Sequence, residues 1–382
     1  MIEKLRTNFK CYTDILYLLY FLPIAGCVSM GISSNQLIYK VCFTISIIFL
    51  LLKVWVTDYK TIEILFMGVI MFLLGYIYLR TSEKSLIISA LSIFGCKDVN
   101  VKKVLKYTLF VYIIGMILTI NMILLGKIQG GIHTLNKGGI EYKINDFGFS
   151  HPNSAYFHLF MITLMIVAVW QERLHWYHYA IMTVIMFVAY KVFLSRTGLL
   201  IYLLLCMAIS ILHIIKFDKL KKALFFTLNL IPVGVFTLSY ILMIYYDKNV
   251  PLINKLNNFV TGRIMCSSQA LKYSGISWFG TVNRLWMEWI FIDNAYLSIL
   301  ISYGIVVCIF CVTAYTLTCF RYWRAGEYYI LIILNIIAVY AFMEYMVVSA
   351  TWNPMLLFMS GVLLWSGREE DKAVINLNKV LK

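Results

Sequence analysis

Charged residues are scarce in this 382-residue chain. Asp, Glu, Lys and Arg together make up 13% of it, about half of the 25% that is typical of soluble globular domains. Apolar residues make up 62%, where soluble domains have about 45–50%. A water-soluble fold needs polar side chains to cover its surface, and this composition does not supply them. The sequence therefore excludes a soluble globular protein and predicts an integral membrane protein.

The sequence also lacks the short motifs of several enzyme classes. Because it has no G-x-x-x-x-G-K phosphate-binding loop, we predict that the protein is not driven by ATP hydrolysis. It has no H-E-x-x-H zinc motif, no G-x-S-x-G nucleophile elbow and no carboxylate-rich metal loop. We therefore predict no metal and no cofactor, and an enzyme built from these parts would act on a substrate presented by the lipid.

The nine cysteines do not form a disulfide framework, because most of them fall within apolar runs. There a thiol behaves as a small hydrophobic group. Cys308 and Cys311 have the spacing of a metal or redox motif, but no partner pair accompanies them. We interpret them as packing residues.

The net charge of +15 does not come with a basic helix, an aromatic-interleaved stripe or a zinc pattern. We therefore predict no nucleic-acid partner. Basic cytoplasmic loops, with some cations facing an anionic lipid substrate, account for the charge.

Continuous apolar runs of about 17–25 residues have the length of helices that cross a hydrocarbon core of about 30 Å. Barrel strands would instead alternate apolar and polar residues. The fold class predicted is all-α, a polytopic transmembrane helix bundle of about 11–12 spans, with the lipid bilayer as its solvent. A short run at Ser85–Gly95 fits a re-entrant segment, an interfacial segment or a thin twelfth helix. No repeat or linker is visible, so residues 1–382 are predicted to form a single integral membrane domain. The predicted spans are 12–31, 36–56, 61–79, 104–126, 152–171, 176–193, 197–215, 223–246, 293–319, 328–347 and 352–366.

Orientation follows from Lys and Arg, which concentrate in cytoplasmic loops. Basic clusters at 97–106, 216–222 and 321–324 are predicted to be cytoplasmic, as are both termini. The first apolar run resembles a signal sequence, and we interpret it as an uncleaved first span. The outer stretches are then Lys127–His151, Leu194–Thr197, Tyr246–Ile292 and Val348–Trp352.

The stretch at about 246–292 is much longer than ordinary connections between helices. Its aromatic residues among polar ones predict a folded extracellular cap with interfacial helices. It carries more basic residues than an outer loop needs. Either a long loop tolerates them, or they receive an anionic substrate. These basic residues are Lys248, Lys255, Arg263, Lys272 and Arg284.

Arg196 lies at the outer junction of two predicted spans, within Ser195-Arg196-Thr197-Gly198. It is either an interfacial anchor or a guanidinium directed at phosphate, for which its planar fork is suited. Ser195 and Thr197 would form the turn that exposes it.

His151-Pro152-Asn153 reads as the start of another span, because proline favours the first helical turn. Helix-start chemistry alone accounts for Asn153. His151 is a candidate general base or phosphate ligand, or an interfacial histidine with neither role.

The long loop ends in Asp293-Asn294-Ala295-Tyr296. Asp293 is placed to cap the following helix, or alternatively to orient an arginine or accept a proton. Glu344 is predicted to lie inside a span, where a carboxylate is functional or is paired with a tyrosine or the outer turn.

Thr261-Gly262-Arg263 in the long loop is a further motif. The four motifs around His151, Arg196, Arg263 and Asp293, in that order, resemble those of the O-antigen polymerase and ligase family. The resemblance is closest to the capsule and exopolysaccharide polymerases of Gram-positive bacteria. It covers about residues 100–320; the rest matches only as generic membrane helices.

The resemblance implies a multi-pass plasma-membrane glycosyltransferase that joins undecaprenyl-pyrophosphate-linked oligosaccharide repeats. Arg196 and Arg263 would hold the diphosphate leaving group, and His151 or Asp293 would take the acceptor's proton. A chain-length regulator and a flippase of the same pathway are expected partners. Substrate-binding residues would be Asn153, Ser195, Thr197, Lys272, Arg284, Asn294 and Tyr296.

Other functions remain open at the level of the sequence. A ligase of the same family would move the glycan to a different acceptor. A transporter or flippase would be expected to show repeats and broken helices with charges at mid-membrane. A scaffold or receptor would leave the basic outer loop unexplained.

Overall fold

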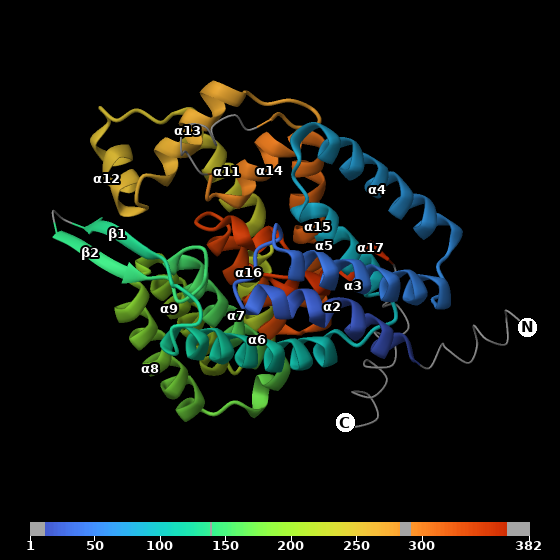
Figure 1. The fold of residues 1–382 in the computed structure, drawn as a ribbon. Helices are drawn as coiled ribbons and strands as arrows, with labels where there is room; N and C mark the ends of the chain where they lie inside the picture. Colours follow the sequence, from blue (N-terminus) through green and yellow to red (C-terminus); the bar gives the residue numbers. More distant parts are fainter. Residues whose placement is uncertain (1–11, 138–139, 283–291, 365–382) are drawn as a thin grey trace, which may run out of the picture. The chain divides into compact units, whose positions relative to one another are not determined.

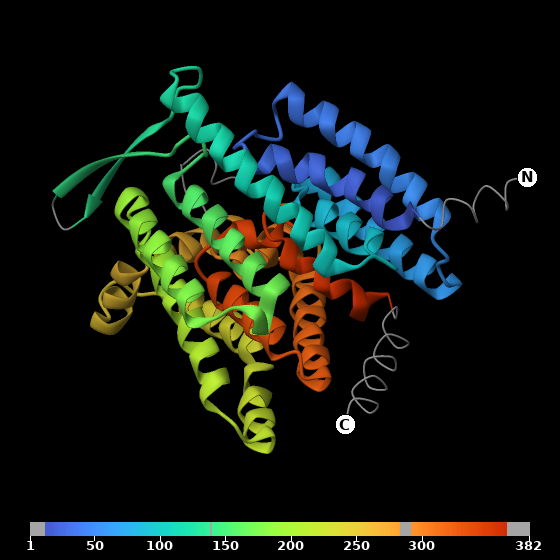
Figure 2. The same cartoon turned by 90° about the horizontal axis from the view of Figure 1, so that it is seen from below.

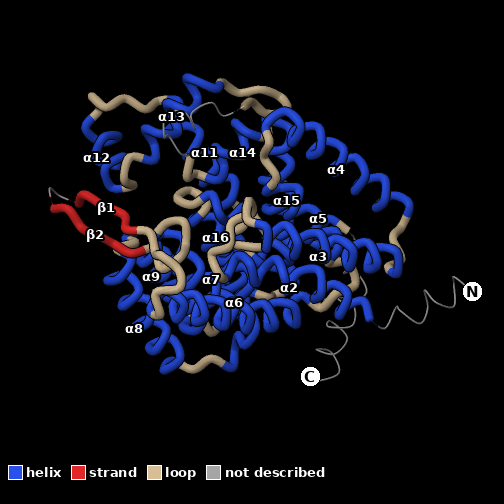
Figure 3. The backbone as a smooth tube through the Cα atoms, viewed as in Figure 1, coloured by secondary structure: helices blue, strands red, loops and turns tan. Residues whose placement is uncertain are grey.

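The computed structural model describes residues 12–137, 140–282 and 292–364. Helices dominate it, and the described residues contain one two-stranded sheet (Figures 1 and 3). They group into two compact units, each built from three separate stretches of the sequence. The first unit comprises Met1–Asp58, Gly95–Met207 and Ala350–Leu357. The second comprises Tyr59–Phe94, Ala208–Ser349 and Phe358–Lys382.

Eight helical segments of the described chain are long and apolar enough to cross a membrane, which confirms an all-α polytopic architecture. They are α3 (Leu37–Val56), α4 (Thr61–Thr81), α6 (Val101–Leu124), α7 (Pro152–Trp170), α8 (Trp176–Phe193), α9 (Arg196–Ile214), the pair α10 (Asp218–Leu228) and α11 (Ile231–Ile244), and α15 (Gly304–Ala325). Shorter apolar helices include α2 (Thr13–Ser29), α5 (Ser85–Gly95) and α16 (Tyr328–Tyr340).

In the first unit, α7 contacts both α6 and α8, and most of its length is buried. The helices α2 and α3 lie side by side, and α2 also contacts α6 (Figure 2). A turn of 3₁₀ helix, η2 (Gln171–Arg173), follows α7. This packing fixes the start of α7, where two of the predicted site residues lie.

The stretch after α6, which the sequence predicts to be an outer one, forms a β-hairpin. Strand β1 (Ile132–Lys137) pairs antiparallel with β2 (Ile140–Asn145), and Ile132 lies opposite Asn145. That register brings the residues just outside the two strands together, so Gly131 and Asp146 become neighbours.

In the second unit, α11 contacts α13 (Arg263–Ser274), α14 (Ala295–Ser302), α15 and α16. Buried apolar side chains from α11, α13, α14 and α15 form one core, which includes Met243, Ala270, Leu297 and Cys308. The long stretch predicted to fold as a cap contains α12 (Pro251–Phe259) and α13 in its described part. Its helical content is therefore confirmed.

The predicted span at 293–319 is wrong as a single helix. The structure breaks it at Tyr303 into α14 and α15, and Gly304 has φ +88°. The apolar pattern continues across the break, so periodicity alone does not reveal it. Residues 277–281 fill the gap with backbone bonds: Ile305 N–H donates to the Ser277 carbonyl (3.0 Å) and Thr281 N–H to that of Ile301 (2.9 Å).

Gly304 is required at this break because a Cβ there would collide with the Trp278 carbonyl oxygen, and its backbone is left-handed. We expect Gly304→Ala to destabilise the protein by about 1–3 kcal/mol, seen as a lower midpoint of thermal unfolding in detergent. Gly234→Ala is the matched control. Gly234 lies within α11 and has open space around it, so alanine should leave the midpoint unchanged or raise it.

Two further predicted spans are shorter than expected. The run at 328–347 is helical only to Tyr340, after which the chain turns and continues as the 3₁₀ helix η4 (Tyr345–Val348). Glu344 therefore lies outside the helix, and its predicted place inside a span is wrong. The run at 352–366 begins with a 3₁₀ helix, η5 (Pro354–Met359), followed by the single turn α17 (Ser360–Leu363). In these two runs the high hydropathy reflects the burial of the residues, and it does not give the length of the helix.

Candidate functional site

The predicted site residues divide between the two units. The first unit contains His151, Asn153, Ser195, Arg196 and Thr197. The second contains Arg263, Lys272, Asp293, Asn294 and Tyr296. Arg284 lies outside the described residues. Each group is therefore considered within its own unit.

Arg263 is the centre of the group in the second unit. It begins α13, directly after Thr261 and Gly262, which both have positive φ (56° and 83°). This turn buries the arginine side chain, which is only 8% exposed. Its Nε donates to Asp293 Oδ2 at 3.0 Å, and its Nη2 donates to Glu344 Oε1 at 3.0 Å. The third nitrogen, Nη1, makes only a long contact of 3.5 Å with Thr261 Oγ1. Two carboxylates thus fix the plane of the guanidinium.

The two carboxylates have different surroundings. The Asp293 side chain is 43% exposed, whereas that of Glu344 is 6% exposed. Burial raises the pKa of Glu344 to about 8, against the opposing attraction of Arg263 and with a further contribution from the negative charge of Asp293. Burial by itself would lower the pKa of Arg263, but the charges of Glu344 and Asp293 outweigh it and the pKa is raised. At neutral pH the cluster therefore favours a charged Arg263 and a protonated Glu344.

This assignment predicts a pH dependence of stability. The unfolded chain ionises Glu344 near its ordinary pKa of 4.5, while the folded chain retains the proton up to about pH 8. The folded state binds the extra proton between these values, so its stability falls as pH rises from about 4.5 to 8. We expect Glu344→Gln, which cannot titrate, to remove that part of the slope in thermal unfolding measured against pH. Equal slopes for both proteins would contradict the assignment.

Asn294 and Tyr296 support the backbone in this structure. Asn294, and not Asp293 as predicted, is the cap of α14: its Oδ1 accepts from Leu297 N–H at 3.1 Å, and its Nδ2 donates to Ser239 Oγ at 2.9 Å. The cap prediction for Asp293 was wrong by one residue, and its alternative role, orienting an arginine, is the one observed. Tyr296 is buried, and its hydroxyl donates to the Ala338 carbonyl at 2.9 Å.

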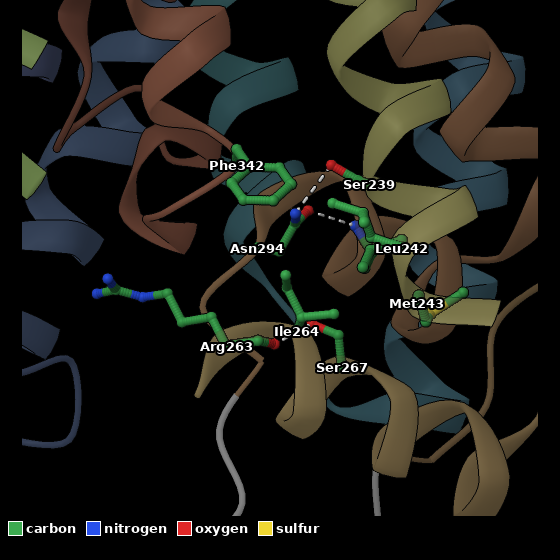
Figure 4. A pocket seen from close by; sticks show the side chains of 9 residues that line it. Ser239, Leu242, Met243, Arg263, Ile264, Ser267, Asn294 and Phe342 are labelled. Atoms are coloured by element: carbon green, nitrogen blue, oxygen red, sulfur yellow. Dashed lines mark hydrogen bonds between the residues drawn. The ribbon is translucent and has the colours of Figure 1, made fainter. Parts of the chain in front are cut away.

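A pocket lies beside these residues, between α11, α13 and α14 (Figure 4). Ser239, Met243 and Asn294 line it together with the backbone end of Arg263. Figure 4 shows the guanidinium pointing away from Ser239 and Asn294. The charged end of Arg263 faces Asp293 and Glu344, away from the pocket. Lys272 is exposed in the last turn of α13.

Arg196 is exposed at the first position of α9 in the first unit. Leu194, with φ 51°, turns the chain between α8 and α9, and Arg196 N–H donates to its carbonyl at 3.1 Å. Ser195 and Thr197 are buried on either side of the arginine. This turn directs a side chain outward at the end of two helices, as the sequence predicted. The Ser195 hydroxyl has no hydrogen-bond partner among the described residues.

His151 is the N-cap of α7, and its Nδ1 accepts from the Asn153 backbone N–H at 3.0 Å. Its ring packs edge-on against that of His133, with centroids 5.2 Å apart. His133 Nε2 in turn lies 3.0 Å from Asp146 Oδ2. His133 and Asp146 were not singled out from the sequence, because 13 residues separate them and only the hairpin register joins them.

The hairpin end also lies near Arg196. Phe147, next to Asp146, packs edge-on against Phe193 with ring centroids 5.6 Å apart. Phe193 ends α8 and precedes Arg196 by three residues. The first unit thus places a histidine–aspartate pair and an exposed arginine around the same helix ends.

Comparison of the chain with family models, with curated proteins and with solved structures finds no match. Among the described residues, no group of three or more His, Cys, Asp or Glu side chains could hold a metal ion. The functional argument therefore rests on the geometry of the two residue groups.

Proposed function

We propose that this protein polymerises undecaprenyl-pyrophosphate-linked oligosaccharide repeats at the outer face of the plasma membrane. In the reaction, the growing glycan leaves its lipid diphosphate and is joined to a hydroxyl of another lipid-linked repeat. The chain is thus a polysaccharide polymerase of the capsule or exopolysaccharide type. What supports this proposal is the chemistry of the residues described above within a protein of membrane-spanning helices.

The observation that carries the proposal is the Arg263 cluster. Arginine is suited to phosphate because its planar fork presents paired N–H donors. Asp293 and Glu344 hold Nε and Nη2 in place, so the orientation of the guanidinium is set before a substrate arrives. Preorganised donors stabilise a developing charge without a cost of reorganisation at the moment of reaction.

The charge of the cluster suits an anionic ligand only when Glu344 is protonated. With both carboxylates ionised the three residues carry a net charge of −1, which would repel a diphosphate. With Glu344 protonated they are neutral, and Nη1 is the arm of Arg263 with the weakest contact in the described chain. A diphosphate that approaches Nη1, or that replaces the half-exposed Asp293 as a partner of Arg263, would contact the positively charged guanidinium.

The reaction makes modest demands on the protein. A lipid diphosphate is a good leaving group, so catalysis consists mainly of positioning two substrates and neutralising charge. In the same proposal, Arg196 of the first unit is a second guanidinium that is suited to phosphate. Lys272 and Arg284 add positive charge to the long loop that receives them.

A flippase for the same lipid-linked repeat is the second candidate. The break between α14 and α15 favours it, because transporters often use discontinuous helices for substrate binding. At this break, however, the N–H groups of Ile305 and Val306 donate to the carbonyls of Ser277 and Trp278. They are not available for a ligand, and the polymerase remains the better-supported function. A family ligase would use the same residues with a different acceptor.

Glycan analysis of cells that lack this gene tests the proposal. Lipid-linked single repeats should accumulate on the outer leaflet, and the wild-type gene should restore long polymer. Repeats trapped on the inner leaflet would instead assign a flippase, and an unchanged glycan profile would refute the polymerase.

A further inference from the structure

The hairpin of the first unit contains a histidine–aspartate pair that neither the sequence motifs nor the proposed roles use. His133 is on β1, opposite Ile144, and its side chain is 30% exposed. Asp146 follows β2, and its side chain is 8% exposed. Their side chains meet at 3.0 Å between His133 Nε2 and Asp146 Oδ2.

Asp146 is held firmly in this position. Its second oxygen, Oδ1, accepts from the backbone N–H of Gly131 at 2.8 Å and from that of Gly148 at 3.0 Å. Three donors thus converge on one buried carboxylate, which fixes its orientation. An ionised carboxylate only accepts hydrogen bonds.

The tautomer of His133 follows from this arrangement. Because Asp146 can only accept, the proton of the neutral imidazole must be on Nε2, and Nδ1 must carry the lone pair. Nδ1 makes no hydrogen bond to any residue within 12–137, 140–282 or 292–364. The contact with Asp146 therefore leaves Nδ1 of His133 as an atom that can accept a proton.

His151 has the opposite arrangement. Its Nδ1 accepts from the Asn153 N–H, so in the neutral ring Nε2 carries the proton and is a donor. A histidine held in this way cannot take a proton at Nε2 without first losing one. The two neighbouring rings therefore offer different chemistry, with His133 as acceptor and His151 as donor.

We propose that His133, oriented by Asp146, is the general base that deprotonates the acceptor hydroxyl, an inference that rests on the proposed glycosyl transfer. The acceptor's O–H bond breaks and its proton moves to His133 Nδ1. The acceptor oxygen forms a bond to the anomeric carbon of the donor sugar, while the bond from that carbon to the diphosphate oxygen breaks and its electron pair leaves on the lipid diphosphate. Asp146 stabilises the imidazolium, and the proton then passes to water.

This assignment replaces the two bases predicted from the sequence. His151 uses its Nδ1 lone pair to cap α7, and Asp293 is engaged with Arg263. His133 lies in the same unit as Arg196. Phe147, next to its partner Asp146, packs against Phe193 at the end of α8, three residues before Arg196. A base and a phosphate-directed cation around one pair of helix ends are what the reaction requires.

The test uses purified full-length protein in lipid vesicles supplied with lipid-linked repeats. We expect His133→Ala to lower kcat about 100-fold or more with little change in KM, and added imidazole to restore part of the rate by replacing the missing base. His175→Ala is the control. His175 is exposed and directly precedes α8. The His175→Ala protein should therefore keep the wild-type rate, and added imidazole should not change that rate.

Asp146→Asn tests the orienting role. The amide oxygen can keep both backbone bonds at Oδ1, but the amide nitrogen then donates to His133 Nε2 and moves the ring proton to Nδ1. We expect a fall in kcat of about 100-fold or more, as when the aspartate of a serine-protease triad is replaced in the same way, with unchanged amounts of folded protein.

Three outcomes would overturn the inference. One is a His133→Ala protein that works within twofold of the wild-type rate. Another is a slow His133→Ala protein that does not respond to imidazole, together with a His133→Gln protein that works at the wild-type rate, which would make the role structural. The third is a wild-type protein that makes no polymer, which refutes the proposed function itself and is seen before any variant is compared.

Discussion

Arg263→Gln should abolish polymer formation, with a loss of at least about 100-fold in rate, the effect of removing one preorganised donor to a developing charge. Glutamine is uncharged and cannot span both carboxylates, so Asp293 and Glu344 would lose the group that holds them. Removing the guanidinium leaves the buried Glu344 without its hydrogen-bond donor, which costs about 1–3 kcal/mol. Rates of polymer formation in vesicles and unfolding midpoints measure the two effects.

The double variant Arg263→Gln with Glu344→Gln separates folding from function. It replaces the buried carboxyl group by an amide, and the two amides can hydrogen-bond to each other. We expect it to recover most of the stability lost in the single variant and none of the activity. Polymer formation at the wild-type rate by the double variant would show that Arg263 serves only the fold.

Arg196→Lys should also abolish activity while leaving the amount of protein in the membrane unchanged. Arg196 is exposed, so its replacement removes no buried contact. Lysine keeps the charge, but a point charge does not replace two parallel N–H donors on a diphosphate. Glycan analysis in deletion cells complemented with each variant measures the effect.

The matched control is Arg324→Lys, which makes the same chemical change at an exposed position near the end of α15. It should support full polymer formation. If Arg196→Lys and Arg324→Lys gave equal amounts of long polymer, Arg196 would be an interfacial anchor without a role in the reaction.

The helical architecture could be predicted from the sequence because lipid leaves the backbone few choices. An apolar segment in hydrocarbon must satisfy its own N–H and C=O groups, and a helix does so. The span predicted at 36–56, for example, agrees to within one residue with α3 (Leu37–Val56). The break at Gly304 was not predictable in the same way, since residues 277–281, from elsewhere in the sequence, satisfy its backbone.

The candidate site shows the same division. Arg263 and Asp293 stood out because charges are rare in this chain, and the structure joins them at 3.0 Å. Glu344 was noticed as an isolated carboxylate, but its partner is 81 residues away, a separation that no local pattern encodes. His133 and Asp146 gave no signal, since a histidine and an aspartate in a polar loop are ordinary until the hairpin register brings them together.

The most direct test of the proposed function is polymerisation by the purified protein in vesicles that contain only lipid-linked repeats. The proposal predicts a ladder of polymer, with one lipid diphosphate released for each bond formed and no need for a nucleotide sugar. Arg263→Gln with Glu344→Gln should give single repeats only. Folded wild-type protein that releases no lipid diphosphate, or that moves repeats across the bilayer without joining them, would contradict the account.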